Sequence, residues 1–214
     1  MFTKQLLLLI ATFSMYATSD AQVVNRRVAR QGQQKKLQRI KQNLPKFEPT
    51  VNISFGYGFP NLDKNEFPEY YNLYKGSINQ TGPFTGSVDY QFSRKASIGL
   101  LVTHGKVSTP YYDYSNASAL SGSLINWSFM LNLIRYMPGA KKVTPYIRTA
   151  IGINAWEQNY TDVDGNKINP PTIPGDFAYQ VGLGAKFILS KNAGFFLEAG
   201  YGKYILNTGL AVKF

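Results

Sequence analysis

From residue 51 onward, apolar and polar side chains alternate along the chain in segments of about ten residues. The clearest segment is 51–59, in which large apolar residues alternate with Asn, Ser and two Gly. Because successive side chains of a strand point to opposite faces, this segment predicts a strand with one apolar face and one small or polar face. The same alternation predicts seven further strands, over residues 82–93, 96–109, 123–136, 144–156, 177–189, 194–203 and 205–214.

The last of these segments ends the chain on an aromatic residue. Its apolar face carries Leu210, Val212 and Phe214, and its other face carries Asn207, Gly209, Ala211 and Lys213. Transmembrane barrels use strands of about this length, with apolar residues towards lipid and polar residues towards the lumen. The ending resembles the terminal assembly signal of bacterial outer-membrane barrels, formed here by Leu210, Val212 and Phe214. Paired with residues 51–59, this strand would close a barrel, with Lys213 pointing inward. The alternative is a soluble β-domain that happens to end on Phe.

The connections between the predicted strands alternate in length. Residues 93–96, 137–143 and 190–193 are short, whereas residues 60–81, 110–122 and 157–175 are longer, and only the connection near Tyr204 is a brief outer one. Outer-membrane barrels have short periplasmic turns and long outer loops. The pattern therefore predicts an all-β fold, an eight-stranded antiparallel up-and-down transmembrane barrel over residues 47–214. The longer loops are rich in tyrosine, a residue that suits a membrane interface, at Tyr70, Tyr71, Tyr74, Tyr111, Tyr112, Tyr114 and Tyr160.

Composition agrees with this fold class. The chain has 214 residues, enough for one domain, and its mean hydropathy of −0.21 excludes a bundle of membrane helices. A barrel has such a value because half of each strand is polar. The absence of Cys excludes a disulfide scaffold, a thiolate metal site and a lipid-anchored amino-terminal cysteine.

The amino-terminal residues 1–21 have the features of a signal peptide. Lys4 precedes an apolar run over residues 6–17, and Ser19 and Ala21 provide the small residues that a signal peptidase needs. We expect cleavage before Gln22 and export to the bacterial outer membrane. The alternative is an uncleaved anchor, although the run is short for a transmembrane helix.

Residues 22–46 form a basic segment that differs from the rest of the chain. Leu37, Ile40 and Leu44 recur at helical spacing before Pro45, so a short amphipathic helix in the periplasm is one possibility. A disordered leader is the other. Such a segment can lie on an anionic membrane surface or bind an acidic protein partner; an exported chain rarely meets nucleic acid. The basic residues are Arg26, Arg27, Arg30, Lys35, Lys36, Arg39, Lys41 and Lys46.

The inward faces of the predicted strands carry four charged residues in their periplasmic halves: Asp89, Arg148, Lys186 and Glu198. An eight-stranded barrel has an interior just wide enough for side chains to fill, and buried charges need partners. We therefore expect a charge network and a closed lumen. A narrow conduit for ions or small solutes is the alternative.

Candidate chemistry is sparse. His104 near the outer end of its strand is the one possible general base, but Ser108 would lie about 13 Å away along a strand, too far for a nucleophile and base pair. Asp162, Asp164 and Asn166 have the spacing of the start of a calcium loop, without the distal Glu that such a loop needs; an ordinary turn explains them better. We expect no catalytic, cofactor-binding or metal-binding residues.

Taken with the closing residues Gly-Leu-Ala-Val-Lys-Phe, the strand count and loop alternation make residues 47–214 resemble the small eight-stranded outer-membrane barrels, the OmpA, OmpX and OmpW class and the PorT-like families. The resemblance implies insertion by the barrel assembly machinery, contact with outer-membrane lipid and, for most members, no enzymatic activity. It favours a structural or interaction role, in which the outer loops or the basic segment contact a partner. A PorT-like accessory role in protein secretion would be one case. A lipid A-modifying barrel enzyme is the least favoured alternative, because the motifs of those enzymes are absent.

Overall fold

The computed structural model describes residues 47–66, 78–113, 118–161, 164–168 and 174–214. The expected signal peptide over residues 1–21 and the basic segment over residues 22–46 lie outside this part of the chain. The residues from Phe47 to Phe214 form one compact unit. Within the described ranges, no helix is both long enough and apolar enough to cross a membrane.

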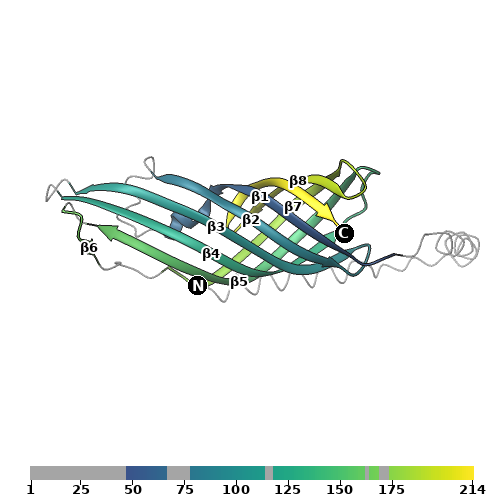
Figure 1. The fold of residues 1–214 in the computed structure, drawn as a ribbon, viewed down its shortest axis with the longest axis horizontal. Coiled ribbons are helices and arrows are strands. Elements are labelled where there is room, and N and C mark those ends of the chain that lie inside the picture. The colour runs from purple at the N-terminus through teal and green to yellow at the C-terminus, as the bar shows by residue number, and fades with distance from the viewer. Residues whose placement is uncertain (1–46, 67–77, 114–117, 162–163, 169–173) are drawn as a thin grey trace, which may run out of the picture. The chain divides into compact units, whose positions relative to one another are not determined.

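Eight long antiparallel strands form a closed ring. The sheet order is β4-β3-β2-β1-β9-β8-β7-β5, and an additional β4–β5 pairing closes it, while the two-residue β6 extends β5 on one side. Figure 1 shows these strands winding around a common axis. The predicted eight-stranded up-and-down barrel is thus confirmed. The elements are β1 (Thr50–Asn61), η1 (Leu62–Glu66), β2 (Asn79–Gln91), β3 (Ala96–Asp113), β4 (Ser118–Tyr136), β5 (Val143–Thr161), β6 (Lys167–Ile168), β7 (Phe177–Ile188), β8 (Ala193–Tyr201) and β9 (Tyr204–Lys213).

The first and last strands meet, as the alternation at the carboxy-terminus predicts. Asn52 on β1 is opposite Lys213 on β9, and the pairing continues to Asn61 opposite Tyr204. The chain end is held in the same ladder, because the Val51 N–H donates to the Phe214 O at 3.1 Å and the Phe214 N–H donates to the Val51 O at 2.8 Å. The carboxy-terminal residue is therefore part of the barrel wall.

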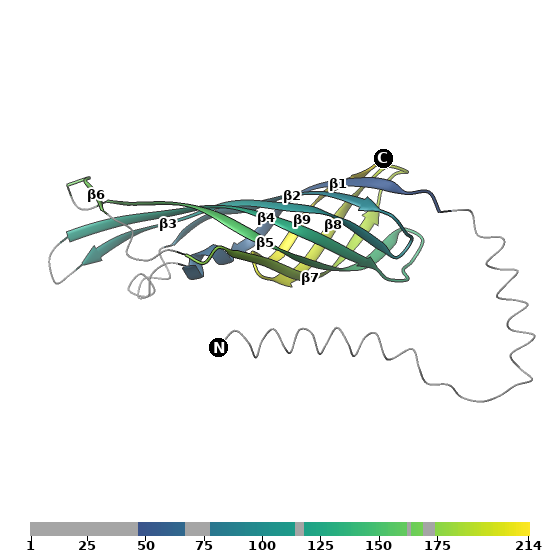
Figure 2. The same ribbon diagram turned by 90° about the horizontal axis from the view of Figure 1, so that it is seen from below.

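Three short connections, residues 92–95, 137–142 and 189–192, lie at one end of the barrel, which we call the turn end, and β1 begins and β9 ends there as well. The opposite end, which we call the loop end, carries η1 and the two longest connections, residues 62–78 and 162–176. It also carries two short connections, residues 114–117 between β3 and β4 and residues 202–203 between β8 and β9. In Figure 2 the turn end is the end marked by the carboxy-terminus.

Three strands are longer than their alternation predicts. The backbone of β3 pairs with β4 as far as Asp113 opposite Ser118, and β4 pairs with β5 as far as Ser121 opposite Thr161. The connections predicted over residues 110–122 and 157–175 are therefore shorter than expected. These strands run past their neighbours at the loop end (Figure 1). Backbone pairing extends them beyond the point where the polar and apolar pattern becomes irregular.

The outward face of the barrel is apolar. Phe55 is 71% exposed, Leu131 is 54% exposed and Leu210 is 65% exposed, so their neighbours in the barrel do not cover them. Soluble monomers rarely expose a continuous apolar surface of this kind. Other large apolar side chains on this face are Phe59, Phe84, Val88, Leu100, Trp127, Phe129, Ile151, Ile153, Phe177, Leu183 and Leu197.

The inward face is mostly polar, with apolar clusters at defined heights. Leu101, which interrupts the alternation of its strand, is 1% exposed and packs in the lumen with Met130, Ala150 and Ala178. A second cluster of Val107, Leu124 and Tyr160 lies nearer the loop end. Apolar residues at inward positions, where strict alternation would place polar ones, therefore fill part of the lumen.

Candidate functional site: the barrel lumen and its two ends

Glu198 on β8 is the centre of the first polar cluster in the lumen. It is fully buried and forms an ion pair with Arg148 on β5, with 3.1 Å between Arg148 Nε and Glu198 Oε2. The Tyr146 hydroxyl donates to Glu198 Oε2 at 2.9 Å, and the Tyr204 hydroxyl donates to Oε1 at 2.8 Å. A buried carboxylate needs such partners, because an unpaired charge in the interior is costly.

Glycines on β7 make this cluster possible. The strand β7 lies between β5 and β8, and one row of the ladder places Tyr146, Gly184 and Glu198 side by side. A Cβ atom at Gly184 would collide with the Tyr146 ring, and a Cβ atom at Gly58 on β1 would lie 2.8 Å from the Tyr204 Cβ. The absence of a side chain at Gly184 lets Tyr146 reach the carboxylate across β7, and the absence of one at Gly58 leaves room for Tyr204, which lies on β9 next to β8.

The other two charged residues predicted for the lumen do not join this ion pair. Asp89 is 1% exposed, and it accepts hydrogen bonds from Asn132 Nδ2 at 2.6 Å and from the Ser87 hydroxyl at 2.8 Å. Lys186 is half-buried nearer the turn end, where its Nζ is 3.3 Å from the Tyr136 hydroxyl. Among the described residues, neither Asp89 nor Lys186 forms an ion pair. Neutral donors satisfy the Asp89 carboxylate, and the Lys186 ammonium group lies nearer the turn end than the Arg148–Glu198 pair.

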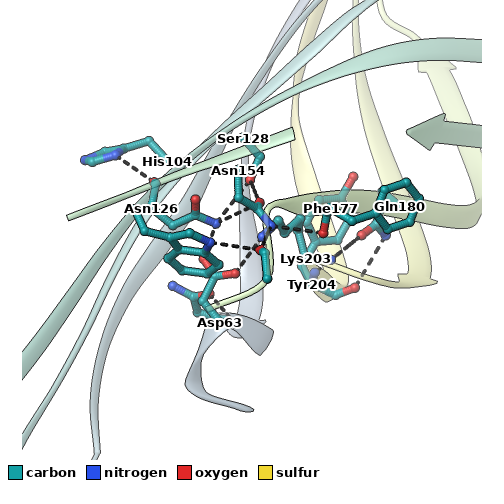
Figure 3. A network of polar contacts seen from close by, with 12 residues as sticks. Asp63, His104, Asn126, Ser128, Asn154, Phe177, Gln180, Lys203 and Tyr204 are labelled. Atoms are coloured by element: carbon teal, nitrogen blue, oxygen red, sulfur yellow. Dashed lines mark hydrogen bonds and ion pairs between the residues drawn. The ribbon is translucent and has the colours of Figure 1, made fainter. Parts of the chain in front are cut away.

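A second ion pair lies in the lumen at the loop end. After β1, the η1 turn folds back and buries Asp63, whose Oδ1 is 2.8 Å from Lys203 Nζ. Asn126 Nδ2 donates to the other Asp63 oxygen at 3.1 Å, and Lys203 Nζ lies 5.0 Å from the centre of the Trp156 ring. Figure 3 shows Asp63 and Lys203 within this network. A loop carboxylate thus binds a lysine from the β8–β9 connection inside the barrel.

Amides extend this cluster across the lumen. Asn154 on β5 accepts from the Asn126 amide at 3.2 Å and donates to the carbonyls of Gly175 and Phe177, both at 3.0 Å. Gln180 Oε1 accepts the Lys203 N–H at 2.7 Å. Figure 3 labels Asn126, Asn154, Phe177, Gln180 and Lys203, which belong to β4, β5, β7 and the β8–β9 connection. The connection at Lys203 is therefore anchored to the barrel interior.

Sequence reasoning did not find this second cluster. Asp63 falls in a segment that the pattern assigns to an outer loop, and Lys203 falls at the end of a predicted strand. No alternation or spacing indicates that η1 folds back into the lumen. The Asn residues on inward faces, Asn126 and Asn154, were the one available signal, because buried amides need polar partners.

The turn end contains a cavity of about 320 Å³. Its lining includes Asn52 on β1, Lys186 on β7 and Lys213 on β9, together with Arg94 and Lys191 from two turns. None of the described Asp and Glu residues lines it. The remaining lining residues are Phe47, Gln91, Tyr136, Thr144, Phe187, Ile188, Ser190, Asn192, Ala193, Gly194, Phe195, Ala211 and Val212.

The predicted assembly-signal residues and His104 lie on the outer side of the barrel wall. Leu210, Val212 and Phe214 all point outward on the last strand, with Phe214 68% exposed. His104 is half-buried on the outer wall, where its ring stacks on Trp127 at 4.0 Å between centres and its Nδ1 lies 3.2 Å from the Asn126 carbonyl oxygen.

Several predictions fall where the structure describes no side chains. The basic residues 26–41 and Asp162 lie outside the described residues, and so do the side chains of the outer tyrosines at positions 70, 71, 74, 111, 112 and 114. Tyr160 is described, and it is 3% exposed in the apolar cluster with Val107 and Leu124. It therefore packs inside the barrel instead of facing a membrane interface. Three or more His, Cys, Asp or Glu side chains do not come together anywhere in the described part of the chain.

Comparisons with known proteins give similar folds but no family. No protein-family model matches the sequence, and no curated protein is similar to it. A structure from the de novo design of transmembrane β-barrels matches at 14% identity over 80% of this chain and 100% of that chain, with a TM-score of 0.44. The N-terminal β-barrel domain of OprF from Pseudomonas aeruginosa matches at 12% identity over 78% and 97%, with a TM-score of 0.41.

A third similar structure is Ail, the attachment invasion locus protein of Yersinia pestis, in complex with the heparin analogue sucrose octasulfate. It matches at 11% identity over 78% of this chain and 97% of that chain, with a TM-score of 0.42. At these scores the likenesses carry no argument about function. The architecture is established by the strand pairing of this chain itself.

Proposed function

We propose that this chain is a non-enzymatic bacterial outer-membrane protein, in which a closed barrel spans the membrane and presents its two ends to partners. The observation that carries the proposal is the contrast between the two faces of the barrel wall. Outward side chains such as Phe55 and Leu210 are apolar and exposed, whereas inward side chains such as Glu198 and Gln180 are polar and buried. A barrel with an apolar outside and a filled polar inside suits a lipid bilayer.

The proposed orientation places the turn end in the periplasm and the loop end outside the cell. Short turns face the periplasm in outer-membrane barrels, and the chain enters β1 and leaves β9 at that end. The signal peptide expected over residues 1–21 supports export. Fractionation of cells that express the full chain tests this location, and recovery in the cytoplasm or the inner membrane would overturn it.

The proposed barrel is closed to ions. Side chains with less than 2% exposure occur from Val107 and Leu124 near the loop end to Tyr146 and Ile134 near the turn end, and the Asp63–Lys203 pair lies across the loop end. Purified protein in planar lipid bilayers should therefore give no steady single-channel currents. Such currents would instead support the narrow conduit.

We propose no catalytic role for His104. Its Nδ1 is held by a backbone carbonyl and its ring stacks on Trp127, an arrangement that suits an aromatic residue at a membrane interface. Lipid A from cells with and without the gene should have the same mass spectrum. A change in lipid A on deletion would favour the lipid A-modifying alternative.

The proposed partners are outer-membrane lipid, the barrel assembly machinery during insertion, and a protein that contacts the basic segment over residues 22–46. The segment joins the barrel at the turn end through Phe47, so its partner would be periplasmic. Co-purification from solubilised outer membrane, with and without these residues, tests the role of the segment. Identical recovered proteins in the two samples would make the segment a passive leader.

A further inference from the structure

Three lysines that line the cavity at the turn end, Lys186, Lys191 and Lys213, form no ion pair within the described residues. Lys186 is half-buried, and its Nζ contacts the Tyr136 hydroxyl at 3.3 Å and lies 5.4 Å and 5.9 Å from the centres of the Tyr136 and Tyr146 rings. A partly buried ammonium group is stabilised when an anion approaches it.

Asn52 supplies a second and independent indication. Its side chain lines the same cavity and is 8% exposed, yet its amide nitrogen has no hydrogen-bond partner in the described structure. An amide nitrogen can only donate, and a buried donor without an acceptor is costly. A ligand bound here would therefore present a hydrogen-bond acceptor to the Asn52 amide nitrogen. A negatively charged acceptor would also serve as a counter-ion for Lys186.

The cations are distributed over several elements. Lys186 comes from β7, Lys191 from the turn after it and Lys213 from β9. The acidic groups at this end are not among the lining residues. Asp89 lies opposite Asn52 in the β1–β2 ladder, but its carboxylate accepts from Asn132 and Ser87, and Glu48 and the carboxylate of Phe214 also lie outside the lining. An anion with several charges spread along its length fits this arrangement better than one compact anion. Phe47 and Phe187 add apolar surface for the rest of such a ligand.

We infer that this cavity binds an acidic segment of a periplasmic partner protein, with one carboxylate between Lys186 and Asn52 and further carboxylates on Lys191 and Lys213. The inference rests on the orientation in the proposed function, which places the turn end in the periplasm. Lys186 and Asn52 lie on the inward faces of their strands, whereas lipid would contact the outward faces. A polypeptide that enters from the aqueous side reaches them directly, and the cavity is far larger than the space one water needs.

The test measures binding of a short fluorescent peptide of alternating Glu and Gly to the full mature chain in zwitterionic detergent. A peptide with Gln in place of Glu is the ligand control. Lys186→Gln should raise the Kd about tenfold or more, because it removes a charged donor from a partly buried site. Lys141→Gln removes the same charge from an exposed turn at the same end, outside the cavity lining, and should change the Kd by less than about threefold.

Two further variants protect the test against misfolding. Asn52→Asp keeps the shape of the side chain and adds a negative charge, so it should also weaken binding about tenfold or more. The double variant Lys191→Gln and Lys213→Gln changes only exposed side chains and should weaken binding while it leaves the barrel folded. Folding of each variant is checked by the heat-dependent shift of the barrel on an SDS gel.

Three results would overturn the inference: equal weakening by Lys186→Gln and Lys141→Gln, equal affinity for the Glu and Gln peptides, or unchanged binding in all cavity variants. A lipid arm uses nanodiscs of phosphatidylcholine with or without phosphatidylglycerol. If phosphatidylglycerol displaces the peptide from the unsubstituted chain but not from the Lys186→Gln variant, the cavity binds a lipid headgroup. That result would reject the acidic segment as its ligand. Fractionation and conductance test the proposed function separately, so a closed outer-membrane barrel that fails to bind the Glu peptide refutes this inference alone.

Discussion

The ion pair between Arg148 and Glu198 allows a quantitative test of how the lumen is held together. Glu198→Gln preserves the shape of the side chain but removes its charge, and it leaves the Arg148 guanidinium 2% exposed without its partner. Removing one member of a buried pair typically costs about 3–5 kcal/mol. Part of the hydrogen bonding survives, because a glutamine oxygen can still accept from the Tyr204 hydroxyl. We expect a loss of about 3–5 kcal/mol in the free energy of unfolding.

The matched comparison is Asp89→Asn, the same chemical change at another buried carboxylate of the lumen. Asp89 has hydrogen bonds from Asn132 and Ser87 but no ion pair in the described structure. Its replacement should change stability by no more than about 1 kcal/mol. The double variant Arg148→Met and Glu198→Gln leaves no unpaired charge at the first site, so it should recover at least about 2 kcal/mol relative to the sum of the single variants.

The assay is equilibrium urea unfolding of the barrel in lipid vesicles, followed by the fluorescence of Trp127 and Trp156. Both lie on strands of the barrel wall, so their signals report loss of the fold. The reasoning would be refuted if Glu198→Gln cost no more than Asp89→Asn, or if the double variant showed no coupling. In either case, the tyrosine hydroxyls and general packing would hold the lumen, and the ion pair would contribute little.

Three further predictions concern the wall and its ends. Phe214→Ala should lower the amount of folded barrel in the outer membrane severalfold, as measured by the heat-dependent gel shift. Phe92→Ala, the same change at another exposed aromatic residue of the turn end, should not lower it. Normal levels of the Phe214 variant would show that the ending is no assembly signal. Leu131→Arg should lower the free energy of unfolding in vesicles by about 2–4 kcal/mol, whereas Leu131→Met should change it little. An Arg variant as stable as the original chain would argue against a lipid-facing wall. Asp63→Ala should release η1 and speed tryptic cleavage at Lys64, unlike the exposed Glu66→Ala control; unchanged cleavage would mean that the Lys203 pair does not hold this turn.

The strands could be predicted from sequence because one property, the period of two, decides both their existence and which face meets the lumen. Strand ends were less predictable. At the loop end, β5 continues to Thr161 because its backbone pairs with β4 and β6, and its inward Tyr160 packs on Val107 and Leu124. These contacts depend on the neighbouring strands and leave no regular pattern within β5 itself.

The partners of the lumen charges could not be predicted for a related reason. Arg148 and Glu198 lie on strands that are not neighbours, and they meet because β7 between them presents Gly182 and Gly184 at that height. Inward orientation follows from alternation, but the height at which two side chains face each other depends on the register of every strand between them. The alternation therefore indicates which charges on the strands face inward but not which of them pair.

The two ends of the lumen differ in how their charges are balanced. At the loop end, Lys203 has its carboxylate partner Asp63, and the side chains of Asn154 and Gln180 and the Asn126 amide nitrogen also have partners, whereas the Asn126 side-chain oxygen has none in the described structure. At the turn end, Lys186 and the amide nitrogen of Asn52 lack acceptors of the kind they need. The loop-end ion pair shows that this barrel can neutralise a buried lysine without a ligand, whereas Lys186 at the turn end forms no ion pair within the described residues. Binding should therefore be sought first at the turn end, where an acidic ligand would supply what the barrel lacks.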